Sequence, residues 1–351
     1  MPVATYRLSQ LECDAVDALL ASLLPRYESA GSPEFCAAAR RLAYARLPAG
    51  LTAFLDGFQR DDGAPAVAVS GFTVDEGRLG PTPAHWNTRV GDMTARREEL
   101  FFVLLGSVLG EPFGWTTLQG GRLIQNVVPI RGQEQEQSGH GSAAVLAWHT
   151  EDAFHPYRCD YLGLMGLRNE QRIPTTYAVL DAGVLTAIER RTLHEPRFLM
   201  RPDDEHLNQR ERDGPAPSAA DRAVLRHLQE PVSVAVLFGD PRRPYLRIDP
   251  VFMSAVPGDA QAVAALDTLV RRLDGALDGF VIEPGTVCFF DNYRVVHGRR
   301  AFRPRYDGRD RWLKKILLTR DARKSRALRV EVEVPVLVPA PVDARQETIA
   351  G

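Results

Sequence analysis

The chain has 351 residues, of which 44% are hydrophobic and 25% charged, an ordinary composition for a globular protein with a sizeable core. Its 43 basic and 45 acidic residues give a formal net charge of −2, which argues against a general attraction to nucleic acid or to an anionic membrane and favours a small-molecule partner. The four cysteines form no Cys-x-x-Cys pair, no signal peptide is recognised and no apolar run reaches the ~20 residues of a membrane span, so we expect reduced thiols in a cytoplasmic protein.

The first 120 residues are expected to be a mainly helical support. Ser9-Gln-Leu-Glu12 is a capping box before leucines at helical spacing, which predicts an amphipathic helix over residues 10–25. Ser32-Pro33 opens a second helix, and residues 94–109 predict a largely buried one. Residues 66–74 read as a strand. Such a helical layer usually covers a sheet.

Strands dominate from residue 121 to residue 325. Many short strands separated by Gly and Pro turns predict a sandwich or barrel rather than a parallel α/β sheet. We expect one domain over residues 1–351, with a C-terminal tail over 326–351 that wraps the surface or is disordered. The main predicted strands are residues 123–130, 146–149, 161–167, 175–180, 232–238 and 245–249, and a helix is predicted over 259–277.

Two polar segments are too long to be simple connections. They are residues 132–142, just before the strand at 146–149, and residues 201–221, which are rich in Asp, Arg, Gly and Pro. Long loops inside a compact domain are usually functional or disordered. We expect both to be lids that exclude water from a reactive site.

A metal site is indicated by residues 148–159, which read Trp-His-Thr-Glu-Asp-Ala-Phe-His-Pro-Tyr-Arg-Cys. In an extended segment His149 and Glu151 point to the same side. A His-x-Glu triplet is weak by itself, because a chain with 8 histidines and 45 acidic residues contains such triplets by chance. A second histidine, His297, lies on a short strand far along the chain and would complete a two-histidine, one-carboxylate site for Fe(II).

These motifs resemble those of the Fe(II)/2-oxoglutarate-dependent oxygenases, in the clavaminate synthase-like branch, and within it the hydroxylases of free amino acids such as arginine β-hydroxylases. The resemblance rests on His-Thr-Glu-Asp-Ala-Phe-His-Pro at 149–156, Val-His-Gly-Arg at 296–299 and Arg-Tyr-Asp-Gly-Arg-Asp-Arg-Trp-Leu-Lys at 305–314. It extends over roughly residues 85–325. It implies a double-stranded β-helix, or jelly roll, with helices packed outside.

The resemblance also implies an activity: hydroxylation of an unactivated carbon by Fe(II), 2-oxoglutarate and O2. His149, Glu151 and His297 match the metal ligands of the family, Arg311 matches its 2-oxoglutarate arginine and Thr176 its threonine partner. Arg311 has a reason of its own, since a guanidinium at an apolar strand is a costly buried charge unless it meets a carboxylate. The alternative is a surface arginine.

The substrate is expected to be a free L-amino acid with a long polar side chain, hydroxylated at C3 or C4, in specialised-metabolite (antibiotic) biosynthesis. The resemblance implies that Glu151 and Gln119 meet the α-amino group, and that Lys315 stands where relatives bind the α-carboxylate with an arginine. Arginine hydroxylases clamp the guanidinium with two acids. Here Asp249 remains and Val251 takes the second place, so arginine, citrulline and lysine rank close together, ahead of a cyclic amino acid such as pipecolate.

Other classes of protein fit the sequence less well. A zinc hydrolase is disfavoured because His-Glu-x-x-His is missing, and a nucleobase deaminase because Pro-Cys-x-x-Cys is missing. A metal-free or metal-binding jelly-roll module without enzymatic activity is the non-catalytic alternative. His155 is expected to leave the metal strand before Pro156 and not to bind the metal.

Overall fold

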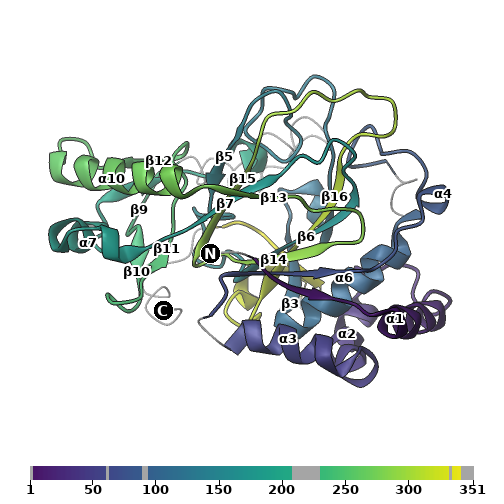
Figure 1. Cartoon of the computed structure of the whole chain (residues 1–351). Helices are drawn as coiled ribbons and strands as arrows, with labels where there is room; N and C mark the ends of the chain where they lie inside the picture. Colours follow the sequence, from purple (N-terminus) through teal and green to yellow (C-terminus); the bar gives the residue numbers. More distant parts are fainter. Residues whose placement is uncertain (1–2, 61–62, 89–93, 208–229, 332–333, 341–351) are drawn as a thin grey trace.

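The computed structural model describes residues 3–60, 63–88, 94–207, 230–331 and 334–340. Two β-sheets form the centre of the molecule, and helices pack outside them (Figure 1). This arrangement matches the predicted β core with flanking helices. No helix within these ranges is long and apolar enough to cross a membrane.

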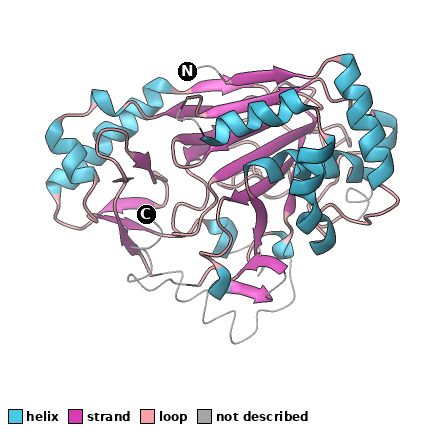
Figure 2. Cartoon of the chain, turned by 90° about the horizontal axis from the view of Figure 1, so that it is seen from below, coloured by secondary structure: helices cyan, strands magenta, loops and turns pink. Residues whose placement is uncertain are grey.

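The larger sheet runs in the order β1-β2-β14-β6-β16-β3-β18-β17, with β4 paired to β16 beside this path. Figure 2 shows its strands side by side with helices packed along them. Every residue of β6 is buried because helices cover one face and the second sheet covers the other, which explains its continuous apolar sequence. The strands are β1 (Ala4–Arg7), β2 (Ala66–Ser70), β3 (Glu111–Trp115), β4 (Ile124–Val127), β6 (Tyr161–Arg168), β14 (Val287–Asp291), β16 (Trp312–Thr319), β17 (Arg329–Glu331) and β18 (Val334–Leu337).

The smaller sheet has the order β13-β7-β15-β5 and carries the two motif histidines. Its strands are β5 (Leu146–His149), β7 (Thr175–Val179), β13 (Asp278–Phe280) and β15 (Val295–Arg299). Its pairings are antiparallel, as in a jelly roll. Beside it lie a sheet of order β12-β8-β9 and the hairpin β10-β11. These elements are β8 (Phe198–Met200), β9 (Val232–Val234), β10 (Leu237–Phe238), β11 (Tyr245–Leu246) and β12 (Met253–Ala255).

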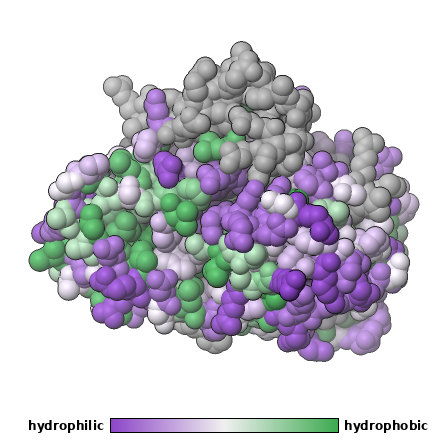
Figure 3. Space-filling view, turned by 90° about the horizontal axis from the view of Figure 1, so that it is seen from above, coloured by the Kyte–Doolittle hydropathy of each residue, from purple (hydrophilic) through white to green (hydrophobic). Residues whose placement is uncertain are grey.

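The helices form two groups. α6 (Arg96–Leu109) packs against β16, β6 and β3 and is covered by α1 (Gln10–Leu23), α2 (Pro33–Arg46) and α3 (Ala49–Arg60). α7 (Ala187–Leu193) and α10 (Ala260–Ala276) pack together on the side of the smaller sheet. Hydrophobic side chains are more frequent on that side of the surface in Figure 3. The short helix α4 is Glu76–Leu79.

A buried ion pair joins α6 to β16. Lys314 is fully buried, and its Nζ lies 2.5 Å from Glu99 Oε1. The next residue, Lys315, points to the opposite face of β16 and into the space between the sheets, because side chains alternate along a strand. Lys314 therefore contacts the helical layer, whereas the neighbouring Lys315 contacts a residue in the space between the sheets.

Several predicted elements are confirmed. The Ser9 capping box starts α1, with the Ser9 side chain and Glu12 exchanging hydrogen bonds with each other's backbone. α2 begins at Pro33, and α6 and α10 lie within the predicted ranges. The helix α3 was not predicted, because Pro48-Ala-Gly50 reads as a stop after α2 and instead precedes a new helix.

The C-terminal segment differs from the predicted tail. The strands β17 (Arg329–Glu331) and β18 (Val334–Leu337) form here, and β18 runs parallel to β3 with Leu337 opposite Trp115. Prolines 335 and 339 suggested a segment outside the sheet, but a proline is tolerated at a strand that pairs near a sheet edge. Residues 341–351 of the predicted tail lie outside the described residues.

Candidate active site

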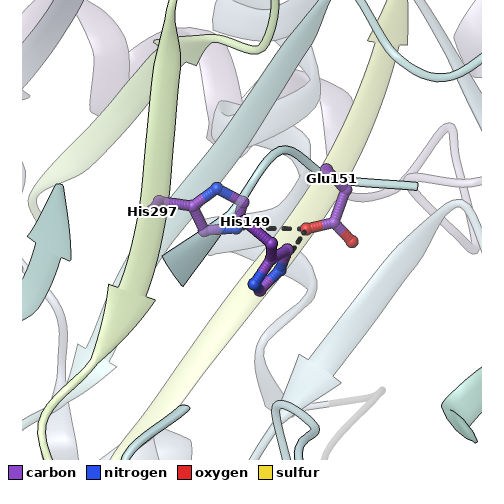
Figure 4. Close-up of side chains that lie close together, drawn as sticks. All are labelled: His149, Glu151 and His297. Carbon is purple, nitrogen blue, oxygen red and sulfur yellow. Dashed lines mark hydrogen bonds and ion pairs between the residues drawn. The ribbon is translucent and has the colours of Figure 1, made fainter. Parts of the chain in front are cut away.

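The sheet register brings the two motif histidines together. His149 ends β5 and lies directly opposite His297 on β15, and their ring centroids are 4.6 Å apart. Glu151 follows in the turn after β5, and its carboxylate points between the two rings (Figure 4). The predicted triad is therefore assembled from two neighbouring strands and one turn.

The distances within the triad fit a metal ion. Glu151 Oε2 is 3.1 Å from His297 Nε2 and 3.8 Å from His149 Nε2, and one ligand atom from each residue lies within 4.8 Å of the others. Ligand atoms at right angles, each about 2.1 Å from a metal, are separated by about 3 Å. Two imidazoles and a carboxylate on one side of a metal form the ligand set of non-haem Fe(II) oxygenases.

The surroundings of the two histidines set which ring nitrogen faces Glu151 and how readily each ring is protonated. The Nδ1–H of His149 donates to the Ala147 carbonyl at 2.9 Å, which leaves Nε2 turned toward Glu151. Burial lowers the pKa of His297 and so favours the neutral imidazole that binds metals. Burial also lowers the pKa of His149, but the hydrogen bond with Glu151 and the charges of Asp249 and Glu151 together outweigh burial and raise this pKa to about 9. Metal binding at His149 therefore displaces a proton.

Two contacts fix the position of Glu151. Its backbone N–H donates to Asn292 Oδ1 at 2.7 Å. Lys315, which lies on β16 in the other sheet, donates to Glu151 Oε1 at 2.8 Å. Burial disfavours the charged carboxylate, yet Lys315 and the two histidines hold the pKa of Glu151 well below its usual range. Glu151 is therefore ionised, and Lys315 pairs with it across the inter-sheet space.

A positively charged region lies beside the triad, as expected for a carboxylate site. Arg311 is 8% exposed, and among the described residues it forms no ion pair and its Nε has no hydrogen-bond partner. Burial and then the neighbouring Arg299 lower the pKa of Arg311 to about 9. A guanidinium buried without a counter-charge fits the far carboxylate of a dicarboxylic acid.

The threonine beside Arg311 is Thr175 and not Thr176. Arg311 Nη2 donates to Thr175 Oγ1 at 3.4 Å. In the pairing of β7 with β15, Thr175 is opposite Arg299 and therefore shares a face with His297, whereas Thr176 is opposite Gly298 and faces away. The prediction of Thr176 was wrong by one position, and one position reverses the direction of a strand side chain.

The chain matches a known protein family over most of its length. A protein-family model described as taurine catabolism dioxygenase TauD, TfdA family matches residues 91–317. The chain belongs to the TauD, TfdA family. The predicted resemblance to iron and 2-oxoglutarate oxygenases and the jelly-roll fold class are thereby confirmed.

Relatives within the TauD, TfdA family cover nearly the whole chain. Enduracididine beta-hydroxylase of Streptomyces hygroscopicus is 40% identical, covering 95% of this chain and 99% of its own. L-ornithine/L-arginine 3-hydroxylase of Catenulispora acidiphila is 41% identical, covering 90% and 94%. The crystal structure of the non-haem iron oxygenase OrfP with Fe, succinate and (3S)-hydroxy-L-Arg is 41% identical, with a TM-score of 0.90 and coverage of 96% and 100%. OrfP has also been solved with Fe and alpha-ketoglutaric acid, which is 2-oxoglutarate.

A cavity of about 870 Å³, partly open to solvent, extends from Arg311 past the triad. Three acids, Asp249, Asp203 and Glu205, line it together with Val251, and Glu205 Oε1 lies 3.6 Å from His140 Nε2. Of these acids the sequence singled out only Asp249. Burial raises the pKa of Asp249, and it raises the pKa of Asp203 to about 6.

Asp203 and Glu205 belong to a segment that was expected to be a lid. Residues 204–207 form a helical turn and place both acids in the cavity wall. Residues 208–221 of the predicted lid lie outside the described residues. The other predicted lid, 132–142, contributes residues 137–140 to the same wall.

Gln119 is held rigidly at the cavity wall. Its carboxamide donates to the Asn126 carbonyl at 2.7 Å and accepts from the Asn126 N–H at 2.9 Å. The buried His140 lies 3.4 Å from Gln119 Nε2 and also contacts the Val128 carbonyl. Burial lowers the pKa of His140, so a neutral ring lies against the amide. These contacts keep Gln119 facing the cavity, as a substrate-binding residue requires.

His155 lies outside the triad, as predicted. Its Nδ1 accepts from the Tyr157 N–H at 3.0 Å and its Nε2 is 3.2 Å from the Ala340 carbonyl. Burial lowers the pKa of His155 to about 3, which keeps the ring neutral. The residue links the turn after β5 to the end of the described chain.

Proposed function

We propose that this chain hydroxylates C3 of a free L-amino acid with a cationic side chain, with L-arginine as the first candidate, using Fe(II), 2-oxoglutarate and O2. The main observation behind this proposal is that the triad of His149, Glu151 and His297 shares one cavity with Arg311. This guanidinium is buried, and its Nε has no hydrogen-bond partner among the residues that the structure describes. A metal-binding module without enzymatic activity does not need such a cation.

The residues divide the cavity into three parts. His149, Glu151 and His297 would hold the metal, which supplies the oxidising power for C–H hydroxylation together with O2 and 2-oxoglutarate. Arg311, assisted by Thr175, would bind the far carboxylate of 2-oxoglutarate through the planar guanidinium. The remaining part is left for the amino acid.

The amino-acid end of the cavity carries both charges that such a substrate needs. The ammonium of Lys315 has three donors, of which one meets Glu151. Another can bind the α-carboxylate, while Glu151 and Gln119 accept hydrogen bonds from the α-amino group. Asp249, Asp203 and Glu205, which line the same cavity, supply negative charge for a cationic side chain.

This acidic wall changes the expected ranking of substrates. With Asp249 alone, a neutral ureido group would bind nearly as well as a guanidinium. Asp203 and Glu205 add to the negative charge of the wall, and a cationic side chain is attracted by this charge more than a neutral ureido group is. Arginine and ornithine are therefore placed ahead of citrulline, and the related enduracididine and ornithine/arginine hydroxylases support both this choice and attack at C3.

The test is a panel of free L-amino acids incubated with the full chain, Fe(II) and 2-oxoglutarate, read by mass spectrometry and by succinate release. We expect arginine to gain one oxygen, with ornithine next and citrulline slower. His149→Ala and His297→Ala should abolish the reaction, whereas His194→Ala, at the end of α7, should not. Equal turnover of citrulline and arginine would contradict the role of the acidic wall.

A second readout does not depend on turnover. Anaerobic addition of Fe(II) and 2-oxoglutarate should give the weak visible absorption of a chelate in the parent chain and not in His297→Ala.

The cytoplasmic location and a role in specialised-metabolite biosynthesis stay predictions. The four free cysteines support a reducing compartment.

A further inference from the structure

A second buried polar cluster lies next to the triad. It consists of Asp152, Asp203 and His206, whose polar atoms lie within 4.8 Å of one another. His206 is 0% exposed and Asp152 is 3% exposed. Burying these groups is costly unless each polar atom has a partner, so their contacts must have a structural or functional reason.

Both ring nitrogens of His206 are occupied by side chains. Nε2 lies 3.0 Å from Asp152 Oδ1, and Nδ1 lies 2.6 Å from Thr117 Oγ1. The second oxygen of Asp152 accepts from Trp115 Nε1 at 2.6 Å. The ring therefore has no free nitrogen for a metal, and the cluster is a closed hydrogen-bonded network rather than a second metal site.

One end of this network holds the turn that carries Glu151. Asp152 directly follows Glu151 and has a φ of 50°, a left-handed conformation that is uncommon outside glycine. Such a conformation is disfavoured for a residue with a side chain and persists only where the surroundings impose it. The side-chain contacts of Asp152 with His206 and Trp115 provide that constraint.

The other end holds the acidic wall of the cavity. His206 lies between Glu205 and Leu207 in the helical turn, and its backbone N–H donates to Asp203 Oδ1 at 3.0 Å. Its ring also packs against Phe154, with centroids 4.8 Å apart. Asp203 and Glu205, on either side of His206, line the cavity.

We propose that His206 is a positioning residue that anchors the 203–207 segment to the turn after Glu151, and so sets the distance between the side-chain pocket and the reacting centre. This inference rests on the proposed function, because Asp203 and Glu205 must meet the substrate for the anchor to affect its binding. His206 itself is not among the residues that line the cavity.

The contrast that tests it is His206→Phe against His206→Gln. Phenylalanine keeps the ring packing and loses both polar contacts, whereas glutamine keeps an N–H that reaches Asp152. We expect His206→Phe to raise the KM for arginine by about tenfold or more, to leave the KM for 2-oxoglutarate within about twofold, and to increase succinate release per hydroxylated product. His206→Gln should restore the KM to within about threefold of the parent value.

Hydrogen exchange gives a readout without turnover. Peptides that cover residues 203–207 should exchange faster in His206→Phe than in the parent or His206→Gln, and this holds even if arginine is not the substrate. If His206→Phe does not fold, Thr117→Val removes only the Nδ1 contact and should raise the arginine KM in the same direction to a smaller extent.

The proposal fails if folded His206→Phe has an unchanged arginine KM and unchanged exchange, or if both KM values rise together. His194→Phe, with the same chemical change outside the cavity, should leave both KM values unchanged. If the proposed function itself is wrong, the result is different. The parent chain would then hydroxylate no amino acid, while the exchange rates of the parent and His206→Phe would still show whether His206 anchors the 203–207 segment.

Discussion

The ammonium of Lys315 lies 2.8 Å from Glu151 Oε1 and joins the two sheets at the site. The lysine belongs to β16 of the larger sheet, and the glutamate follows β5 of the smaller one. Burial disfavours the ammonium, but the negative charges of Glu151, Glu205 and Asp152 together outweigh burial and raise the pKa of Lys315 above its usual value. The contact therefore keeps both groups charged beside the triad.

Lys315→Met should lower kcat/KM for the amino acid by about tenfold to a hundredfold, because a hydrogen bond between charged groups contributes about 1.5–3 kcal/mol. Lys315→Arg keeps the charge and should retain more activity than Lys315→Met. Steady-state kinetics with varied amino acid measures both variants, and circular dichroism checks their folding. Equal kinetics for the parent and Lys315→Met would remove Lys315 from substrate binding.

Arg311→Ala should raise the KM for 2-oxoglutarate far more than the KM for the amino acid, since losing a charged pair in a buried site costs about 2–5 kcal/mol. Thr175→Val should raise it by a smaller factor, of about fivefold, because the hydrogen bond from Arg311 to Thr175 is long, at 3.4 Å, and contributes only about 1 kcal/mol. Thr176→Val is the matched control and should have no effect. A larger effect at 176 than at 175 would contradict the sheet register.

The pH dependence of arginine binding should report on Asp203. Burial raises its pKa to about 6, so the carboxyl is neutral below this pH and charged above it. A neutral group attracts a guanidinium less, so the ratio of the arginine KM to the citrulline KM should rise as the pH falls through 6. Citrulline controls for effects on the metal site, since its side chain carries no charge. A ratio that still rises in Asp203→Asn would assign the effect to another group.

The buried pair of Lys314 and Glu99 should matter for stability. Glu99→Gln leaves the ammonium of Lys314 without its anion and should lower the free energy of unfolding by about 3–5 kcal/mol. The double variant Lys314→Met/Glu99→Leu removes both charges and should recover much of this loss. The exposed pair of Arg172 and Glu283 is the control, where Glu283→Gln should cost less than about 1 kcal/mol. Urea unfolding measures all of them.

The sequence predicted the metal site well because each of its two segments has a clear pattern of its own. His149 and Glu151 are two positions apart, and His297 lies in a short strand with a clear pattern. The choice between Thr175 and Thr176 could not be made, since two adjacent threonines differ only in the face they occupy and the face depends on pairing with β15. Register between distant strands is a tertiary property.

The acidic wall and its anchor were missed for a related reason. Asp203, Glu205 and His206 lie in a polar stretch that resembles an irregular loop, and nothing local marks their partners. His206 meets Asp152 and Thr117, which lie far away in the sequence. Such contacts can be inferred only once the strands on either side of the cavity are placed.

The opposite directions of Lys314 and Lys315 constrain how this enzyme can diversify. A single insertion or deletion inside β16 would exchange the two lysines, removing the partner of Glu99 and the partner of Glu151 at once. The strand β16 therefore contributes to the core and to the site at the same time, and few changes in it would preserve both. New substrate preferences would have to arise at residues 203–205 and 249–251, where side chains line the cavity from turns and the sheets stay unchanged. Libraries aimed at altered selectivity should vary those two segments and leave β16 untouched.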